Sequence, residues 1–166
     1  MSDSNETTQS SSPVDDFLQI KDFEDKVMYT CTPEELEEVL VSILSVGKYT
    51  KTFSLFKGKI ELTYDSITDE ERSRGYEYIR KYTEENKDNI SRIELENYTT
   101  KVNLALQLAR IKTNGIATNI SQGSIDDRIL LLKSQPEELL RTCSKYLAIF
   151  ANITSKAFNT DGAIKK

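Results

Sequence analysis

Five helix-start signals divide this chain and constrain its fold more than any other feature. In each signal, a Ser or Thr that can cap a helix is followed three residues later by Glu or Asp. This spacing allows the reciprocal hydrogen bonds of a capping box. The signals are Thr32–Glu35, Thr68–Glu71, Ser91–Glu94, Ser124–Asp127 and Ser134–Glu137. They predict about five helices and a mainly helical single domain over residues 31–160.

The apolar positions indicate which helices are buried. The helix that starts at Thr32 is expected to end at Gly47 and carries an apolar stripe at three- to four-residue spacing. The helix over residues 69–86 is mostly charged, which predicts a surface position. The helix that starts at Ser91 is expected to continue to Thr113, and it is apolar on most sides after Lys101. We therefore expect it to be the central helix of the core.

Residues 51–67, KTFSLFKGKIELTYDSI, predict a β-hairpin. Two runs rich in strand-forming residues flank Lys57-Gly58, which we interpret as a two-residue turn. No other segment is clearly typical of a strand, and a two-stranded hairpin alone is marginally stable. At least one edge is therefore expected to bind a partner. The candidate partner-binding residues here are Lys51, Phe53, Ile60 and Leu62. The predicted fold class is mostly α, small α+β, with one hairpin.

The excess negative charge lies in an N-terminal arm, residues 1–30, which holds seven acids and two bases, while the remainder holds twenty of each. Residues 1–13 are Ser/Thr-rich and are expected to be disordered. Residues 14–23 carry apolar anchors among acids, at Phe17, Leu18, Ile20 and Phe23. Either this segment packs on its own domain, or it docks on another protein and folds there. Residues 161–166 are expected to fray.

The composition argues against most enzyme classes. The chain has no His, which removes the commonest general base and metal ligand, and its two Cys are far apart. It contains no GxGxxG or GxxxxGK[ST] motif. Paired acids such as Asp126-Asp127 lie in first helical turns, where the helix dipole explains them. We expect no catalytic residue, no metal and no cofactor. An enzyme that works through carboxylates or Tyr alone is the least favoured alternative.

The same composition bears on partners and location. A domain with balanced charge lacks the excess of Lys and Arg that nucleic-acid binding requires, so no nucleic-acid partner is expected. No apolar run approaches the roughly 18 residues of a membrane span, and no signal peptide is evident. Two separate thiols suit a reducing compartment. A cytoplasmic location without a membrane partner is therefore expected.

The order of these segments resembles a group of assembly proteins of tailed bacteriophages. The resemblance covers about residues 50–150 and rests on the hairpin FKGKIELTYDSIT, an acidic-basic helix, an apolar helix and the segment DDRILLLKSQPEELL. It implies a tail-assembly chaperone or baseplate-type subunit without enzymatic activity. The implied partners are other virion or assembly proteins, or further copies of the chain, in the host cytoplasm during assembly or in the virion. The alternative is a cytoplasmic regulatory or adaptor protein that docks through its acidic N-terminal arm.

Overall fold

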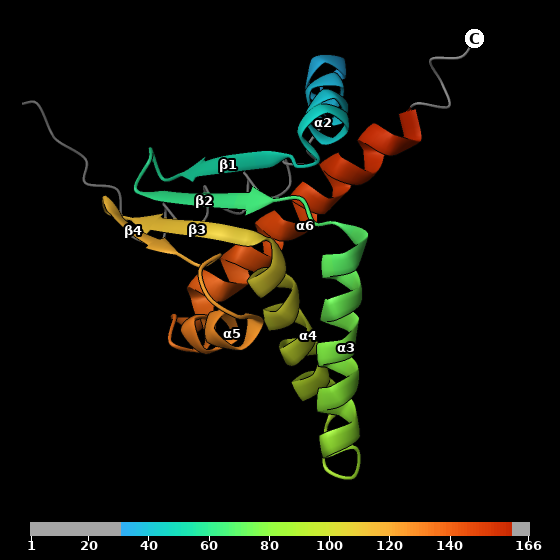
Figure 1. Cartoon of the computed structure of the whole chain (residues 1–166). Coiled ribbons are helices and arrows are strands. Elements are labelled where there is room, and N and C mark those ends of the chain that lie inside the picture. Colours follow the sequence, from blue (N-terminus) through green and yellow to red (C-terminus); the bar gives the residue numbers. More distant parts are fainter. Residues whose placement is uncertain (1–30, 161–166) are drawn as a thin grey trace, which may run out of the picture. The chain divides into compact units, whose positions relative to one another are not determined.

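The computed structural model describes residues 31–160, in which five helices accompany a four-stranded antiparallel sheet (Figure 1). These elements belong to one compact unit that begins at Pro33. In chain order they are α2 (Pro33–Val46), β1 (Thr50–Leu55), β2 (Ile60–Asp65), α3 (Asp69–Asn86), α4 (Arg92–Gln107), β3 (Leu108–Thr113), β4 (Ile116–Asn119), α5 (Ile125–Lys133) and α6 (Glu137–Thr160). The α+β class is confirmed, with more strands than the single predicted hairpin.

Three of the predicted capping boxes form as expected. Thr68, Ser91 and Ser124 each accept a hydrogen bond from the backbone N–H three residues later, and the acid at that position accepts one in return. The prediction that Ser134 caps the last helix is wrong. Ser134 is instead the C-cap of α5, and its hydroxyl donates to the carbonyl of Leu131 at 2.7 Å.

The prediction that the central helix continues to Thr113 is also wrong. Helix α4 ends at Gln107, and residues 108–113 form strand β3. Asn114 and Gly115 both have positive φ, at 49° and 84°, and make a tight turn into β4. Such a turn matches the right-handed twist of paired strands. The segment is a strand because it pairs with β2 on one side and β4 on the other.

The sheet order is β1-β2-β3-β4, so β2 is paired along both edges. The expectation that the first hairpin lacks any further strand partner within the chain is therefore corrected. Its turn is also longer than predicted, because Leu55 pairs with Ile60 and leaves residues 56–59 as a four-residue loop. Phe56 and Lys57 have positive φ in this loop, as does Gly58.

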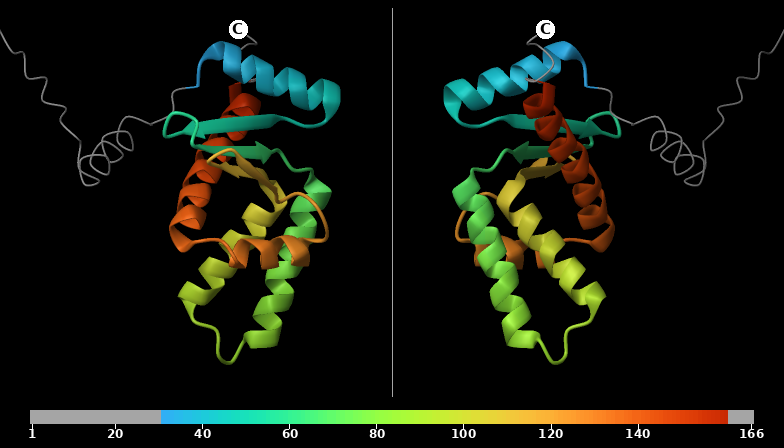
Figure 2. Two further views of the ribbon diagram at one scale, coloured as in Figure 1. Left: turned by 90° about the vertical axis from the view of Figure 1, so that its left-hand side faces the viewer. Right: turned by 90° about the vertical axis from the view of Figure 1, so that its right-hand side faces the viewer.

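One face of the sheet is covered by α6, which crosses it in Figures 1 and 2. Leu62 lies opposite both Phe53 and Ile111, and all three side chains are buried. Phe150 of α6 stacks on Tyr64, with ring centroids 5.7 Å apart. The core therefore lies between the sheet and α6.

The opposite face of the sheet is joined by polar side-chain contacts. The hydroxyls of Thr52 and Thr63 lie 2.9 Å apart across β1 and β2. Lys112 forms an ion pair with Glu61 at 3.0 Å across β2 and β3. This division into an apolar and a polar face follows from the alternation of side chains along each strand.

Helices α3 and α4 form a helical hairpin inserted between β2 and β3. They lie side by side and extend away from the sheet (Figures 1 and 2). Gly75 is the buried residue of α3, which agrees with the predicted surface position of this helix. In α4, Val102, Leu104 and Ala105 are buried, so its C-terminal half belongs to the core.

The acidic arm and the C-terminal tail, residues 1–30 and 161–166, lie outside the described residues. None of the helices within residues 31–160 is long and apolar enough to cross a membrane.

Candidate functional site

The described domain contains a groove of about 690 Å³ that is open to solvent. Five segments line it: the end of α2, the connection from β2 to α3, the first half of α3, the end of α4 and the last turns of α6. We call it the α3/α6 groove, after two of the helices whose side chains line it.

Apolar side chains from four helices line the α3/α6 groove. Ile43 comes from α2, Ile79 from α3, Leu106 from α4 and Phe158 from α6. Tyr76 of α3 is 66% exposed and Phe158 is 52% exposed. Tyr and Phe are enriched where proteins bind each other, so two exposed aromatic side chains in one groove are compatible with a protein interface.

Two lining residues of the groove, Gly75 and Leu106, mark a close approach of α3 and α4. Gly75 has no side chain, and a Cβ at this position would lie 2.6 Å from Cδ1 of Leu106. A glycine in a helix costs about 1 kcal/mol relative to Ala. Its presence here lets the two helices pack closely, and Leu106 lines the groove beside it.

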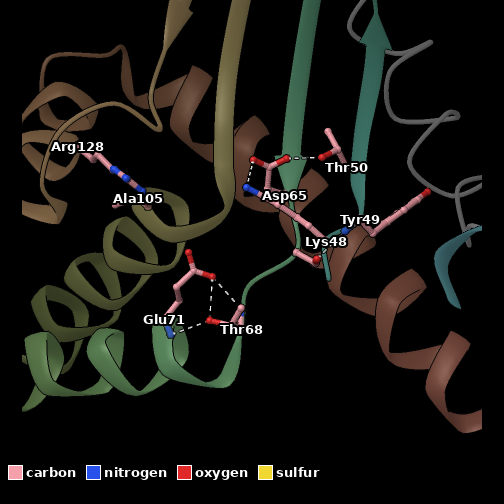
Figure 3. Close-up of polar contacts among 9 residues, drawn as sticks. Lys48, Tyr49, Thr50, Asp65, Thr68, Glu71, Ala105 and Arg128 are labelled. Carbon is pink, nitrogen blue, oxygen red and sulfur yellow. Dashed lines mark hydrogen bonds and ion pairs between the residues drawn. The ribbon is translucent and has the colours of Figure 1, made fainter. Parts of the chain in front are cut away.

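Polar contacts fix the connection from β2 to α3 that forms one wall (Figure 3). Asp65 accepts a hydrogen bond from Thr50 at 2.6 Å and forms an ion pair with Lys48 at 2.8 Å. Thr68 and Glu71 form the capping box that starts α3. Because both ends of this connection are held, the groove wall between them has a defined position.

A separate contact orders the opposite side of α4. The Arg128 guanidinium of α5 donates a hydrogen bond to the carbonyl of Ala105 at 3.2 Å (Figure 3). This carbonyl lies in the last turn of α4, where carbonyl groups lose their helical partners. The bond ties α5 to the end of α4 beside the start of β3.

The structure distributes the predicted partner-binding residues among different environments. Phe17, Leu18, Ile20 and Phe23 lie outside the described residues. Lys51 is half-buried and forms an ion pair with Glu35 of α2. Its Nζ also lies 5.5 Å from the ring centroid of Phe53.

The apolar residues predicted in the hairpin face the core. Leu62 is fully buried, and Phe53 is 7% exposed and packs against Tyr146 with ring centroids 5.1 Å apart. Ile60 is half-buried beside Leu55 and Thr113. These side chains are placed to hold the sheet on α6, and a partner of the hairpin would meet the outer backbone edge of β1. Binding through this hairpin stays a prediction.

Sequence reasoning did not bring the groove residues together. Tyr76 and Ile79 were recognisable as the sparse apolar positions of a charged helix, and Phe158 as an aromatic residue near the end of the chain. The positions span from Ile43 to Phe158, and no local pattern signals that they meet. The one sequence feature that could have indicated the groove is the presence of aromatic residues on helices with few other apolar positions.

Comparison of the chain with protein-family models, with curated proteins and with solved structures gives no match. Within residues 31–160, no group of three or more Cys, Asp or Glu side chains is placed to hold a metal ion. The α3/α6 groove is therefore characterised by its own geometry, in which polar and apolar groups share the lining about equally.

Proposed function

We propose that this protein is a non-enzymatic protein-interaction subunit, and that it acts in the assembly of the tail or virion of a tailed bacteriophage. The observation that carries the proposal is the α3/α6 groove with its two exposed aromatic side chains, Tyr76 and Phe158. Its role is that of a chaperone or of a structural component, and its partners are other virion or assembly proteins.

The groove has the chemistry of a surface that binds another polypeptide. Ile79 and Leu106 contribute apolar side chains to its lining, and Asp69, Arg72 and Thr154 contribute polar ones. Protein interfaces commonly combine an apolar centre with a polar rim, and aromatic residues contribute much of their binding energy. An apolar helix of a partner protein is the class of ligand that such a groove between helices accepts.

The assignment to phage assembly rests on the resemblance of residues 50–150 to tailed-phage assembly proteins. Among the segments that carry it, FKGKIELTYDSIT forms the turn before β2, β2 itself and the connection that ends at Thr68, the N-cap of α3. These segments also supply part of the groove wall, from Ser66 to Asp69. The alternative, a cytoplasmic adaptor that docks through residues 14–23, concerns a segment outside the described residues.

The test compares two exposed phenylalanines in the phage that encodes this chain. Phe158 lies in the groove and is 52% exposed, while Phe56 lies in the β1–β2 loop and is 49% exposed. Phe158→Ala, combined with Tyr76→Ala, should strongly reduce the yield of tailed particles seen by electron microscopy. Phe56→Ala is the matched control and should leave that yield unchanged.

Co-purification from the same infected cells distinguishes the two functions. The unaltered chain should retain at least one virion protein, and the Tyr76→Ala/Phe158→Ala variant should lose it. Normal tailed particles from the double variant would refute a role of the groove in assembly. Retention of host proteins alone, with normal particles from a chain deletion, would favour the adaptor function.

A further inference from the structure

A second cavity, of about 330 Å³, lies among α3, α4 and α5. It shares no lining residue with the α3/α6 groove. Its volume is at the small end of the range for ligand pockets, which suits a single side chain better than a large cofactor. Tyrosine and acidic side chains dominate its lining, so we call it the tyrosine pocket.

The aromatic part of the tyrosine pocket is ordered by contacts between the three elements. Tyr82 of α3 and Tyr98 of α4 stack with an interplanar angle of 11° and ring centroids 3.7 Å apart. Tyr78, one turn before Tyr82, donates a hydrogen bond from its hydroxyl to Oδ2 of Asp126 in α5 at 3.1 Å. The rings are thereby held in place before any ligand arrives.

The charged part of the pocket is negative. Glu77, Glu85 and Asp126 supply three carboxylates, and Lys81 supplies the one ammonium, which gives the lining a net charge of −2. Lys81 lies 3.9 Å from Glu85 and its side chain is 76% exposed, so this ammonium sits toward solvent. Lys81 forms its ion pair with Glu85, so the carboxylates of Glu77 and Asp126 account for the net negative charge of the lining.

Burial and, to a smaller extent, the nearby carboxylates raise the pKa values of two tyrosines in the pocket. Partial burial, followed by the hydrogen bond to Asp126 and its charge, raises the pKa of Tyr78. Burial and then the charge of Asp126 also raise the pKa of Tyr98. The carboxylates that disfavour a negative phenolate favour a cation at the same place.

We propose that the tyrosine pocket binds an arginine side chain from a basic segment of a partner protein. A guanidinium group is planar, so it can stack on a tyrosine ring while its N–H groups donate to carboxylates. The stacked Tyr82–Tyr98 pair and the carboxylate of Asp126 provide both contacts in one cavity.

This inference rests on the proposed function only in assuming that the chain has a protein partner. Its test can fail while the proposed function holds, and the reverse is also true. Its test uses the purified full chain and a synthetic peptide, acetyl-GRGRG-amide, and involves no groove residue. Matched peptides carry lysine or the neutral analogue citrulline in place of arginine. Tyrosine ring signals in NMR spectra follow the titration, because the tyrosine pocket contains three of the eight tyrosines of the chain.

We expect the arginine peptide to bind saturably and to shift the ring signals of Tyr82 and Tyr98. Removing one carboxylate with Asp126→Asn, or the stack with Tyr98→Leu, should weaken binding about fivefold. Glu70→Gln removes the same charge from α3 outside the pocket, where Glu70 pairs with Arg74, and should leave binding unchanged. Raising the salt concentration should weaken binding of the arginine peptide.

Three results would overturn the proposal. Equal binding of the citrulline peptide would show that charge recognition is absent. Equal effects of Asp126→Asn and Glu70→Gln would place any binding outside the pocket. Spermidine that binds as tightly as the arginine peptide, with the same dependence on Asp126, would assign the pocket to a small polyamine instead of a partner protein.

Discussion

The hydroxyl of Tyr64 in β2 donates a hydrogen bond to the backbone carbonyl of Cys143 in α6, at 2.7 Å. Tyr64 and Cys143 are both fully buried. The bond joins the sheet to the helix that covers it across 79 residues of sequence. Because the hydroxyl is buried among apolar side chains, this partner satisfies a group that would otherwise be costly to bury.

Removing this hydroxyl with Tyr64→Phe should lower the free energy of unfolding by about 1 kcal/mol, since the ring still packs on Phe150. Urea denaturation measures the change. Tyr76→Phe is the control, because Tyr76 is 66% exposed and should lose almost nothing. Equal stability of both variants would show that the Tyr64–Cys143 bond contributes little.

A pair of leucines in α5 tests which side of this helix belongs to the core. Leu132 is fully buried, whereas Leu130 is 68% exposed. Leu132→Ala should cost about 2–5 kcal/mol, because it removes buried methyl groups and leaves a cavity. Leu130→Ala should be close to neutral in the same denaturation experiment. Similar losses from both variants would contradict the placement of α5.

The contact between Gly75 and Leu106 predicts a coupled pair of substitutions. Gly75→Leu should destabilise the protein by about 1–3 kcal/mol, because its side chain must enter the space that Leu106 occupies. Combining it with Leu106→Ala should recover part of that loss. A double-mutant cycle measures the coupling, and strictly additive effects would show that α3 and α4 are not in close contact here.

The buried thiol of Cys143 should be protected from thiol reagents, and it should make the stability of the protein depend on pH in the alkaline range. Burial raises the pKa of this thiol from its ordinary value of 9.0 to about 12. The unfolded chain therefore loses the proton at lower pH than the folded protein. The stabilisation that comes from burying the neutral Cys143 thiol is fully present below about pH 9 and is lost as pH rises toward 12.

Two measurements check this expectation. In a Cys31→Ser variant, Cys143 should react with a thiol reagent only as fast as the protein opens, and immediately after addition of denaturant. Between pH 9 and pH 11, Cys143→Ala should lose less stability than the parent chain. A rapid reaction of the native protein would contradict the burial of Cys143.

The helix starts were predictable because each depends on four adjacent residues. Thr68, Ser91 and Ser124 cap their helices through the acid three residues later, and no distant contact is needed. The end of α4 was not predictable by the same means. The apolar run from Val102 to Ile111 suits a buried helix and a buried strand equally well.

The sequence did carry a signal for the missed hairpin. Asn114-Gly115 is the dipeptide most typical of a two-residue hairpin turn, and it lies between Thr113 and Ile116, which pair in the sheet. The same two residues also favour the end of a helix, which is compatible with the expectation that the helix starting at Ser91 continues to Thr113. The choice between the two depends on β2, which lies far away in sequence and offers its free edge to β3.

The groove and the tyrosine pocket were out of reach of sequence reasoning for a related reason. Tyr82 and Tyr98 stand on different helices, and only the packing of α3 against α4 stacks their rings. Their positions on the two helices are typical of an ordinary packing face and do not signal a pocket. The neighbouring carboxylate of Asp126 comes from a third element, whose approach no local pattern specifies.

The helical hairpin inserted between β2 and β3 has a consequence for the order in which the protein folds. These two strands pair only after the chain between them, residues 66–107, has been closed into a loop, and closing long loops costs entropy. Helices form in about a microsecond, far faster than distant strands meet. If α3 and α4 pack first, through Gly75 and the stacked Tyr82 and Tyr98, they turn the chain back and bring Asp65 and Leu108 together. The rate at which α3 packs against α4 would then determine how fast the whole sheet forms.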